Sequence, residues 1–251
     1  MIPLDAIDGG RYGKIICYPR LDAEELRCRL KELRDLKVSG IEFSGRMRIF
    51  GLNVLGKGHA SIVVVAHANQ RRCALKIRRT DADRPDMSHE AELLRAANAI
   101  GVGPKLYNSS KNFILMELIE GIYLPEWIVN IRGEERELRR VLRSILEDCW
   151  RLDKAGIDHG ELSRASRHII VERGTPRIID FESASIRRRT TNVTSICQFL
   201  FLSSKVSKSL SGLMRVGRER LIEALRAYKT RPTRERLERI LDACGINTPY
   251  R

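Results

Sequence analysis

The chain has 251 residues, of which 43% are hydrophobic and 31% are charged. This composition is typical of a folded globular protein and excludes a disordered one, and the length has room for two lobes or two small domains. Lysine and arginine outnumber aspartate and glutamate by 46 to 32, and the resulting charge of +14 attracts polyanions such as nucleotide phosphates, RNA or a ribosomal particle. A solvated basic surface is the alternative, because no RNA-binding motif accompanies the charge.

The sequence also argues against two classes of protein. No apolar run approaches the roughly 18 residues of a membrane-spanning helix, and the first residues lack the layout of a signal peptide. The six cysteines lie far apart and form no Cys-x-x-Cys pair, which favours reduced, buried thiols over disulfides or a zinc site. We therefore expect a cytoplasmic protein that does not associate with a membrane.

The first half of the chain is expected to be rich in strands. A helix is predicted over residues 22–37, because Asp22 is a suitable N-cap and leucines recur at helical spacing. An extended piece follows at residues 40–43. The apolar pattern of residues 47–79 is typical of strands and includes a hairpin. A helix over residues 86–100 and a strand at residues 113–116 complete this half.

The second half is expected to be mostly helical. A strongly amphipathic helix is predicted over residues 134–152, and two short strands lie within residues 168–180. Further helices are expected from Asn192 onward, at residues 215–229 and at residues 233–244. The predicted class is α+β, with three parts: an N-terminal extension with one helix (residues 1–46), a strand-rich lobe (residues 47–120) and a helical lobe (residues 121–251).

Two acidic residues on loops around a short apolar strand form the most informative motif. Glu161 lies in His159-Gly160-Glu161, and Asp180 opens Asp180-Phe181-Glu182 after the strand. One such carboxylate can orient and deprotonate an attacking hydroxyl, while the other holds a divalent cation against phosphates. The layout predicts phosphoryl transfer, with Glu161 as the catalytic carboxylate and Asp180 as a metal ligand. Asp158 is the next carboxylate to consider if Glu161 is not catalytic.

Residues 56–61 are predicted to form a phosphate-binding loop. Gly56 and Gly58 let backbone N–H groups approach phosphates closely, and Lys57 and Ser61 belong to the same loop. The pattern matches the G-x-G-x-x-G-x-V loop of kinases, except that Ser61 replaces the third glycine. An ordinary hairpin turn is the alternative, since such turns often carry two glycines.

Lys76 lies downstream of this loop, inside an apolar strand. A lysine in that position needs an anionic partner, which bound phosphates would supply, whereas on a half-exposed strand it would simply face solvent. Glu90, in the first turn of the next helix, can pair with Lys76 and fix its direction. Glu92 is the competing partner, but the Glu-x-x-Leu-Leu spacing favours Glu90.

In this order, the motifs resemble those of the protein-kinase-like fold. Within it, the chain is similar to the atypical, minimal kinases of the RIO type and to the archaeal predicted serine/threonine protein kinases. The resemblance covers roughly residues 47–205 and depends mainly on the order of the motifs. It implies a bilobal fold with a β-rich N-lobe and a reduced helical C-lobe, and it implies ATP with Mg²⁺ or Mn²⁺. It also implies a hinge that binds adenine, formed by Met116, Glu117 and Leu118.

Two positions depart from the pattern of this family. The family usually has aspartate where this chain has Glu161, whose side chain is one methylene longer. The family's asparagine metal ligand falls on Ser166, and His168 enters the strand two positions later. Ser166 and His168 are therefore the expected substitutes as metal ligands. Because imidazole is a poor ligand for Mg²⁺ and an acceptable one for Mn²⁺, we expect either a preference for Mn²⁺ or a loss of transfer.

We interpret the chain as an atypical serine/threonine protein kinase that transfers the γ-phosphate of ATP to a protein hydroxyl. In this interpretation Lys76 contacts the α and β phosphates, Glu90 positions it, and catalysis comes mainly from positioning and charge neutralisation. The alternative is an ATP-binding pseudokinase or ATPase-like scaffold that docks on RNA or ribosomal particles, which Glu161 and the missing asparagine favour. A small-molecule kinase is a third hypothesis, although the short spans leave little room for its substrate-binding insertion.

Overall fold

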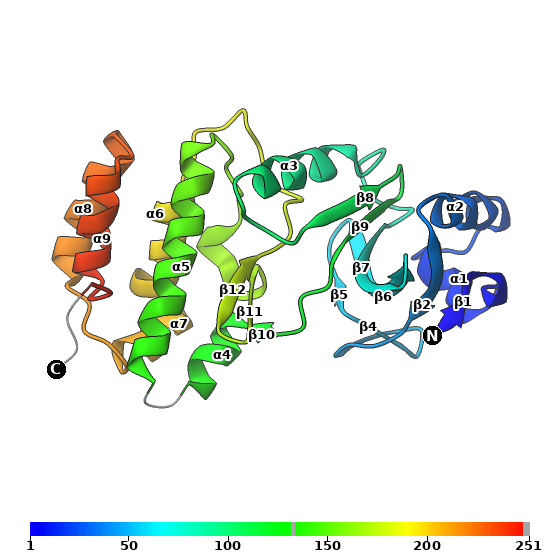
Figure 1. Cartoon of the computed structure of the whole chain (residues 1–251), viewed down its shortest axis with the longest axis horizontal. Helices are drawn as coiled ribbons and strands as arrows, with labels where there is room; N and C mark the ends of the chain where they lie inside the picture. Colours follow the sequence, from blue (N-terminus) through cyan, green and yellow to red (C-terminus); the bar gives the residue numbers. More distant parts are fainter. Residues whose placement is uncertain (132–133, 248–251) are drawn as a thin grey trace. The chain divides into compact units, whose positions relative to one another are not determined.

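The computed structural model describes residues 1–131 and 134–247, which form two compact units. The first unit comprises Met1–Arg95 and Pro104–Leu118, and the second comprises Ala96–Gly103 and Ile119–Arg251. The first unit is rich in strands and the second is mainly helical (Figure 1), which confirms the predicted α+β class and its kinase-like division. The boundaries predicted at residues 46 and 120 stay predictions.

One antiparallel sheet organises the first unit. Its strands follow the spatial order β1 (Ile2–Pro3), β2 (Val38–Glu42), β6 (Ser61–Ala68), β7 (Arg71–Arg78), β9 (Phe113–Glu117) and β8 (Leu106–Ser109), and β5 (Gly56–Lys57) pairs with β6. The hairpin of β3 (Met47–Ile49) and β4 (Leu52–Val54) lies outside this sheet. Alternate residues of β6, beginning with Ile62 and Val64, are buried in the core, as a period of two requires.

The turn of the β6–β7 hairpin sets the register in which these two strands pair. Asn69 and Gln70 connect the two strands, and both have positive φ, at 48° and 62°. A two-residue turn of this hand matches the right-handed twist of the strands that it joins. It sets Val63 opposite Lys76, and Lys76 in turn lies opposite Ile114 of β9. The turn therefore fixes the neighbour of Lys76 on the β6 side.

The residues before β2 form more than the single predicted helix. Helix α2 (Ala23–Asp35) lies where it was predicted, and the Asp22 carboxylate accepts hydrogen bonds from the backbone N–H groups of its first turn. The prediction of one helix is wrong, because α1 (Arg11–Ile16) precedes it (Figure 1). Six residues make fewer than two turns, so α1 leaves no apolar period in the sequence. Gly13, which reads as a helix breaker, is needed there: a Cβ would lie 2.3 Å from the Asp8 carbonyl oxygen.

Arg29 of α2 ties this N-terminal segment to the sheet. Its side chain is fully buried, and its guanidinium donates to the carbonyls of Ile16 (2.7 Å) and Arg78 (2.6 Å) and to Asn112 Oδ1 (3.2 Å). Its Nε donates to Glu25 Oε1 at 2.6 Å. The first 46 residues also supply apolar side chains to the same core as the sheet, so they are an integral part of this unit.

The second unit combines a small sheet with helices. Its strands are β10 (Ile122–Tyr123), β11 (Ile169–Glu172) and β12 (Thr175–Ile178), in that antiparallel order. Its helical segments are α4 (Leu124–Asn130), α5 (Glu135–Lys154), the 3₁₀ turn η2 (Leu162–Arg167), α6 (Asn192–Cys197), the π turn η3 (Gln198–Leu202), α7 (Lys205–Ser211), α8 (Arg218–Thr230) and α9 (Arg234–Ala243). The expected range 121–251 includes residues 132–133 and 248–251, which lie outside the described residues.

The longest helix of this unit, α5, buries the apolar face that its sequence predicts, including Leu138, Leu142, Ile145 and Leu152. Among the residues that the structure describes, no helix combines the length and the apolarity that crossing a membrane would take.

Replacing Arg29 is predicted to destabilise the first unit. Arg29→Met removes the donor from two backbone carbonyls and an amide oxygen, so the free energy of unfolding should fall by about 2–4 kcal/mol. Urea unfolding followed by circular dichroism measures the change. Arg27→Met, on the exposed face of the same helix, is the matched control and should stay within about 0.5 kcal/mol of the wild type. Equal stability of the two variants would contradict the structural role of Arg29.

Candidate active site

The first unit contains a buried ion pair. Lys76 Nζ on β7 donates to Glu90 Oε1 on α3 (Ser88–Ala99) at 2.5 Å, and their side chains are only 3% and 4% exposed. Glu92, the competing partner, is exposed on another face of the helix. Burying two charges costs solvation energy that their mutual attraction does not always return. The predicted pairing of Lys76 with Glu90 is thus confirmed. The desolvation energy that the pair costs favours a functional use of Lys76 over a purely structural one.

The loop of residues 56–61 is a tight turn that leads from β5 into β6. The Gly58 N–H donates to the Ser61 carbonyl at 2.8 Å, and the Ser61 side chain is buried. A Cβ built on Gly56 would meet no atom within 4 Å, and one on Gly58 would meet only ordinary contacts at 3.6 Å. The packing of the loop therefore does not require these glycines. Their use fits a ligand that must approach the backbone closely, as phosphates do.

Three side chains fasten this loop to the N-terminal segment. The Lys57 ammonium lies 5.0 Å from the centre of the Tyr18 ring, and the Arg79 guanidinium carbon lies 5.1 Å from it. Arg79 also donates to the Gly58 carbonyl at 3.3 Å. A cation is attracted to the face of an aromatic ring, so Tyr18 contacts the loop directly through Lys57 and indirectly through Arg79. No sequence motif predicted this role of Tyr18.

The predicted hinge residues lie at the end of β9 and just beyond it. Met116, Glu117 and Leu118 are all half-buried. The Glu117 N–H donates to the Lys105 carbonyl at 2.8 Å, and Glu117 Oε2 accepts from the Lys105 N–H at 3.0 Å. This backbone donor of Glu117 is thus engaged within the first unit. Adenine recognition by Met116, Glu117 and Leu118 stays a prediction.

The loop that leads to Glu161 is anchored by the two residues before Gly160. Asp158 is buried and accepts from Thr191 Oγ1 at 3.1 Å and from Arg188 Nε at 3.1 Å, so its carboxylate has a structural role. His159 is fully buried, and its Nε2 lies 3.1 Å from the Ile179 carbonyl, which can only accept. Burial lowers the pKa of His159 to about 4, so the ring is neutral at pH 7.

Gly160 is the one position of this loop that only glycine can occupy. Its φ is 88°, and a Cβ would lie 2.6 Å from Arg188 Nη2 and 2.8 Å from the Ser183 carbonyl oxygen. An L side chain would be strained in this conformation and would also collide with backbone. The glycine therefore lets the loop turn tightly and brings the next residue, Glu161, against the segment that contains Ser183.

The Glu161 carboxylate is held between two donors. Ser183 Oγ donates to Oε1 at 2.8 Å, and His168 Nε2 lies 2.6 Å from Oε2. The Glu161 side chain keeps 41% of its exposure, so solvent and a substrate can still reach it. His168 in turn places its ring edge-on to His159, with the ring centres 5.6 Å apart. The extra methylene of glutamate is accommodated by these contacts.

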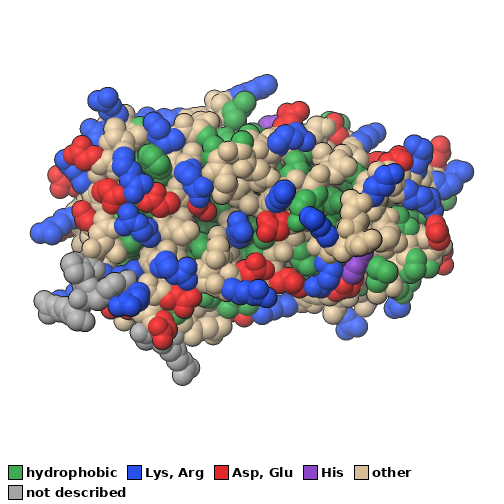
Figure 2. Space-filling model, in the orientation of Figure 1, with side chains coloured by type: hydrophobic (Ala, Val, Ile, Leu, Met, Phe, Trp, Pro, Cys, Tyr) green, Lys and Arg blue, Asp and Glu red, His purple; other side chains and the backbone are tan. Residues whose placement is uncertain are grey.

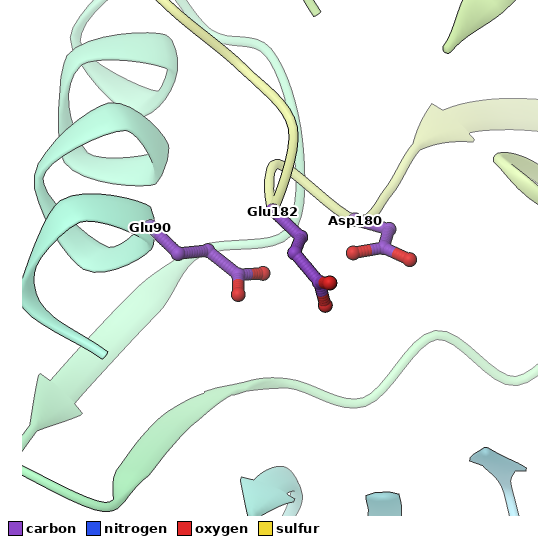
Figure 3. Close-up of side chains that lie close together, drawn as sticks. All are labelled: Glu90, Asp180 and Glu182. Carbon is purple, nitrogen blue, oxygen red and sulfur yellow. The ribbon is translucent and has the colours of Figure 1, made fainter. Parts of the chain in front are cut away.

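Asp180 and Glu182 form a carboxylate pair on the segment that follows β12. Their oxygens lie within 4.8 Å of one another and both side chains are half-buried, while Phe181 between them is buried against the His159 ring. Figure 3 shows the two carboxylates projecting from this segment, and it also draws Glu90 of α3. Because Phe181 points inward, the Asp-x-Glu spacing puts both acids on the other side. Asp180 has a φ of 69°, a strained conformation that is common at functional sites.

This carboxylate pair fits a divalent cation, because Mg²⁺ and Mn²⁺ favour oxygen ligands. The sequence prediction named Asp180 and missed Glu182 as a ligand, although the Asp-x-Glu spacing was a usable signal. Nε2 of His168 is engaged by Glu161, and Ser166 is exposed on η2. The roles of His168 and Ser166 as metal ligands stay predictions.

Comparisons with known proteins agree with these features. Residues 62–190, slightly more than half of the chain, match the family model of the RIO domain. The match includes Lys76, Glu90, Glu161 and Asp180, and it begins after residues 56–61. An uncharacterized protein of Methanocaldococcus jannaschii is 28% identical over 102 residues, which are 41% of this chain and 85% of that protein.

His159 is predicted to make the stability of the second unit depend on pH. The unfolded state takes up a proton below about pH 6.5, whereas the folded state resists it down to about pH 4. The free energy of unfolding should therefore fall as the pH drops through this window, by at most about 3.4 kcal/mol. Urea unfolding at a series of pH values measures the slope. His159→Gln should flatten it and the exposed His59→Gln should not, whereas equal slopes in all three proteins would contradict the burial of a neutral His159.

Proposed function

The chain belongs to the RIO domain family, whose members are kinase-related, and from this premise we propose an ATP-dependent serine/threonine protein kinase. The observation that carries the proposal is the bond between Glu161 and a hydroxyl on the segment that also bears Asp180 and Glu182. A carboxylate that orients a hydroxyl next to a metal-binding pair is the arrangement that phosphoryl transfer to an alcohol uses.

The proposal gives roles to most of the predicted site residues and to Glu182. Gly56 and Gly58 let the phosphates of ATP approach the backbone of the loop that ends at Ser61, and Lys76, directed by Glu90, contacts the phosphates. Asp180 and Glu182 hold Mg²⁺ or Mn²⁺, which neutralises phosphate charge when bound. Glu161 orients the attacking hydroxyl and takes its proton.

His168 receives a different role from the one that the resemblance implied. Its Nε2–H bond to Glu161 makes it a positioning residue for the carboxylate. The side chain of Ser166 is exposed, and we assign it no role in the reaction.

The alternative, a scaffold that docks on RNA or a ribosomal particle, stays a prediction. In the arginine run of residues 187–189, Arg188 donates to Asp158 and to the Ser183 carbonyl, and Arg189 donates to the Lys229 carbonyl. These two arginines are therefore also used inside the second unit. Figure 2 shows Asp and Glu side chains interspersed among Lys and Arg across the visible face. The charge thus marks no single docking surface on that face.

Nucleotide binding is predicted to depend on the Lys76–Glu90 pair and on Asp180. Millimolar ATP with Mg²⁺ or Mn²⁺ should raise the melting temperature, by the equivalent of about 2.7 kcal/mol when ATP is 100-fold above its Kd. Lys76→Met and Glu90→Gln should remove most of this shift, and Asp180→Asn should remove its metal-dependent part. Asn tolerates the left-handed backbone of Asp180, so the variant should fold. Glu92→Gln is the matched control and should respond as the wild type does; the absence of any shift in the wild type would refute the proposal.

Phosphate transfer is predicted to depend on Glu161. Glu161→Gln should keep the ATP-induced shift and slow transfer from labelled ATP to a generic basic protein by about 10²–10⁴-fold, the usual contribution of a general base. Glu161→Asp restores the usual kinase acid with a shorter reach and should keep partial activity. Glu219→Gln, exposed on α8, is the control. Transfer at the wild-type rate by Glu161→Gln would show that another group is catalytic.

A further inference from the structure

A hydroxyl of the chain itself is hydrogen-bonded to the proposed catalytic carboxylate. Ser183 Oγ donates to Glu161 Oε1 at 2.8 Å, which is an ordinary distance for such a hydrogen bond. Within residues 1–131 and 134–247, no other hydroxyl bonds to Glu161. Ser183 is half-buried, so the bond is neither sealed in the core nor fully exposed.

The direction of this bond is set by the surrounding structure. His168 holds the second oxygen of Glu161 at 2.6 Å, so the carboxylate cannot rotate without breaking one of two bonds. His168 is only 14% exposed and packs edge-on against the fully buried His159, which is fixed to the Ile179 carbonyl. A chain of contacts from the core to Glu161 thus aims Oε1 at the Ser183 hydroxyl.

The residues around Ser183 supply the other groups that the reaction needs. Ser183 directly follows Glu182, whose carboxylate lies within 4.8 Å of that of Asp180, so the hydroxyl is on the metal-binding segment. On the other side, Arg188 Nη2 donates to the Ser183 carbonyl at 2.6 Å. A guanidinium so close can pair with a phosphate on this serine and offset repulsion from the two carboxylates.

We propose that Ser183 is an internal phosphate acceptor, a modification site at which the protein phosphorylates itself within one chain. This inference rests on the proposed kinase function. In the step, Ser183 Oγ bonds to the γ-phosphorus of a nucleoside triphosphate. The bond from that phosphorus to its bridging oxygen breaks, and its electron pair leaves with the nucleoside diphosphate. The hydroxyl proton passes to Glu161 Oε1 and from there to solvent.

The test incubates the full-length protein with γ-labelled ATP and Mg²⁺ or Mn²⁺ and locates the label by peptide mass spectrometry. Label should accumulate on Ser183 towards about one phosphate per chain, with a rate constant that does not change with protein concentration. Ser183→Thr keeps a hydroxyl and should be labelled at the same position. Ser183→Ala should lower incorporation by at least about tenfold, while Ser185→Ala, two residues further along, should not.

Failure of this inference differs from failure of the proposed function. Label on other residues or on a basic protein substrate, with Ser183 unmodified, overturns the assignment of Ser183 and leaves the kinase standing. No label on any protein overturns both. A rate constant that grows with protein concentration shows transfer between chains and overturns the internal step.

A second measurement needs no nucleotide. The unfolding midpoints of Glu161→Gln, Ser183→Ala and the double variant should be non-additive, because both single changes break the same bond. Additive shifts would show that this bond is not formed in solution and would overturn the proposal.

Discussion

The second unit depends on one buried carboxylate. Asp153, near the end of α5, is 7% exposed and accepts four hydrogen bonds: from the N–H and side-chain amide of Asn192, from the Val193 N–H and from the Tyr228 hydroxyl. Burial raises its pKa, as expected for an acid far from water, and the four donors compensate for the lost solvation. The carboxylate joins α5, α6 and α8, which are distant in sequence.

The same centre extends to the candidate catalytic loop through Asn192. Its side-chain oxygen accepts from the His159 N–H, and its amide also donates to the Ile157 carbonyl. The loop that carries Glu161 is therefore held in place by Asn192 and Asp153, which have no part in the proposed chemistry. Hydrogen bonds of this kind preorganise a site, so little energy is lost in arranging it during the reaction.

In the first unit, buried positive groups with hydrogen-bond partners have the corresponding structural role. Arg29 fixes the N-terminal segment to the sheet through buried carbonyls, and Lys76 is directed by the buried Glu90. Breaking a buried pair is costly, whereas an apolar replacement of both partners is often tolerated. Arg29 cannot be exchanged in this way, because two of its partners are backbone carbonyls, whereas the Lys76–Glu90 pair consists of two side chains. The substitution of glutamate for aspartate at position 161 follows similar logic, since the longer side chain reaches both His168 and Ser183.

Much of the molecule could be predicted from local pattern. Alternation of apolar residues gave the strands of the first unit, helical spacing gave α2, α3 and α5, and the Glu-x-x-Leu-Leu spacing favoured Glu90, which the structure pairs with Lys76. These features depend on neighbours a few residues apart, so the sequence displays them directly. The short helix α1 was missed because it is too short to show a period.

Other features were decided only by tertiary structure. The turn after Gly160 brings Glu161 to the ring of His168, and the same turn brings Ser183 to the carboxylate, whereas metal binding by His168 stays a prediction. Asp153, Arg29 and Tyr18 carry no motif, because their partners lie on elements far along the chain. The sequence alone determined which chemical groups the protein has and the local elements that present them. The packing of segments distant in sequence decided which of those groups lie in contact. A hydrogen bond between two side chains forms only when tertiary packing has placed both backbone segments.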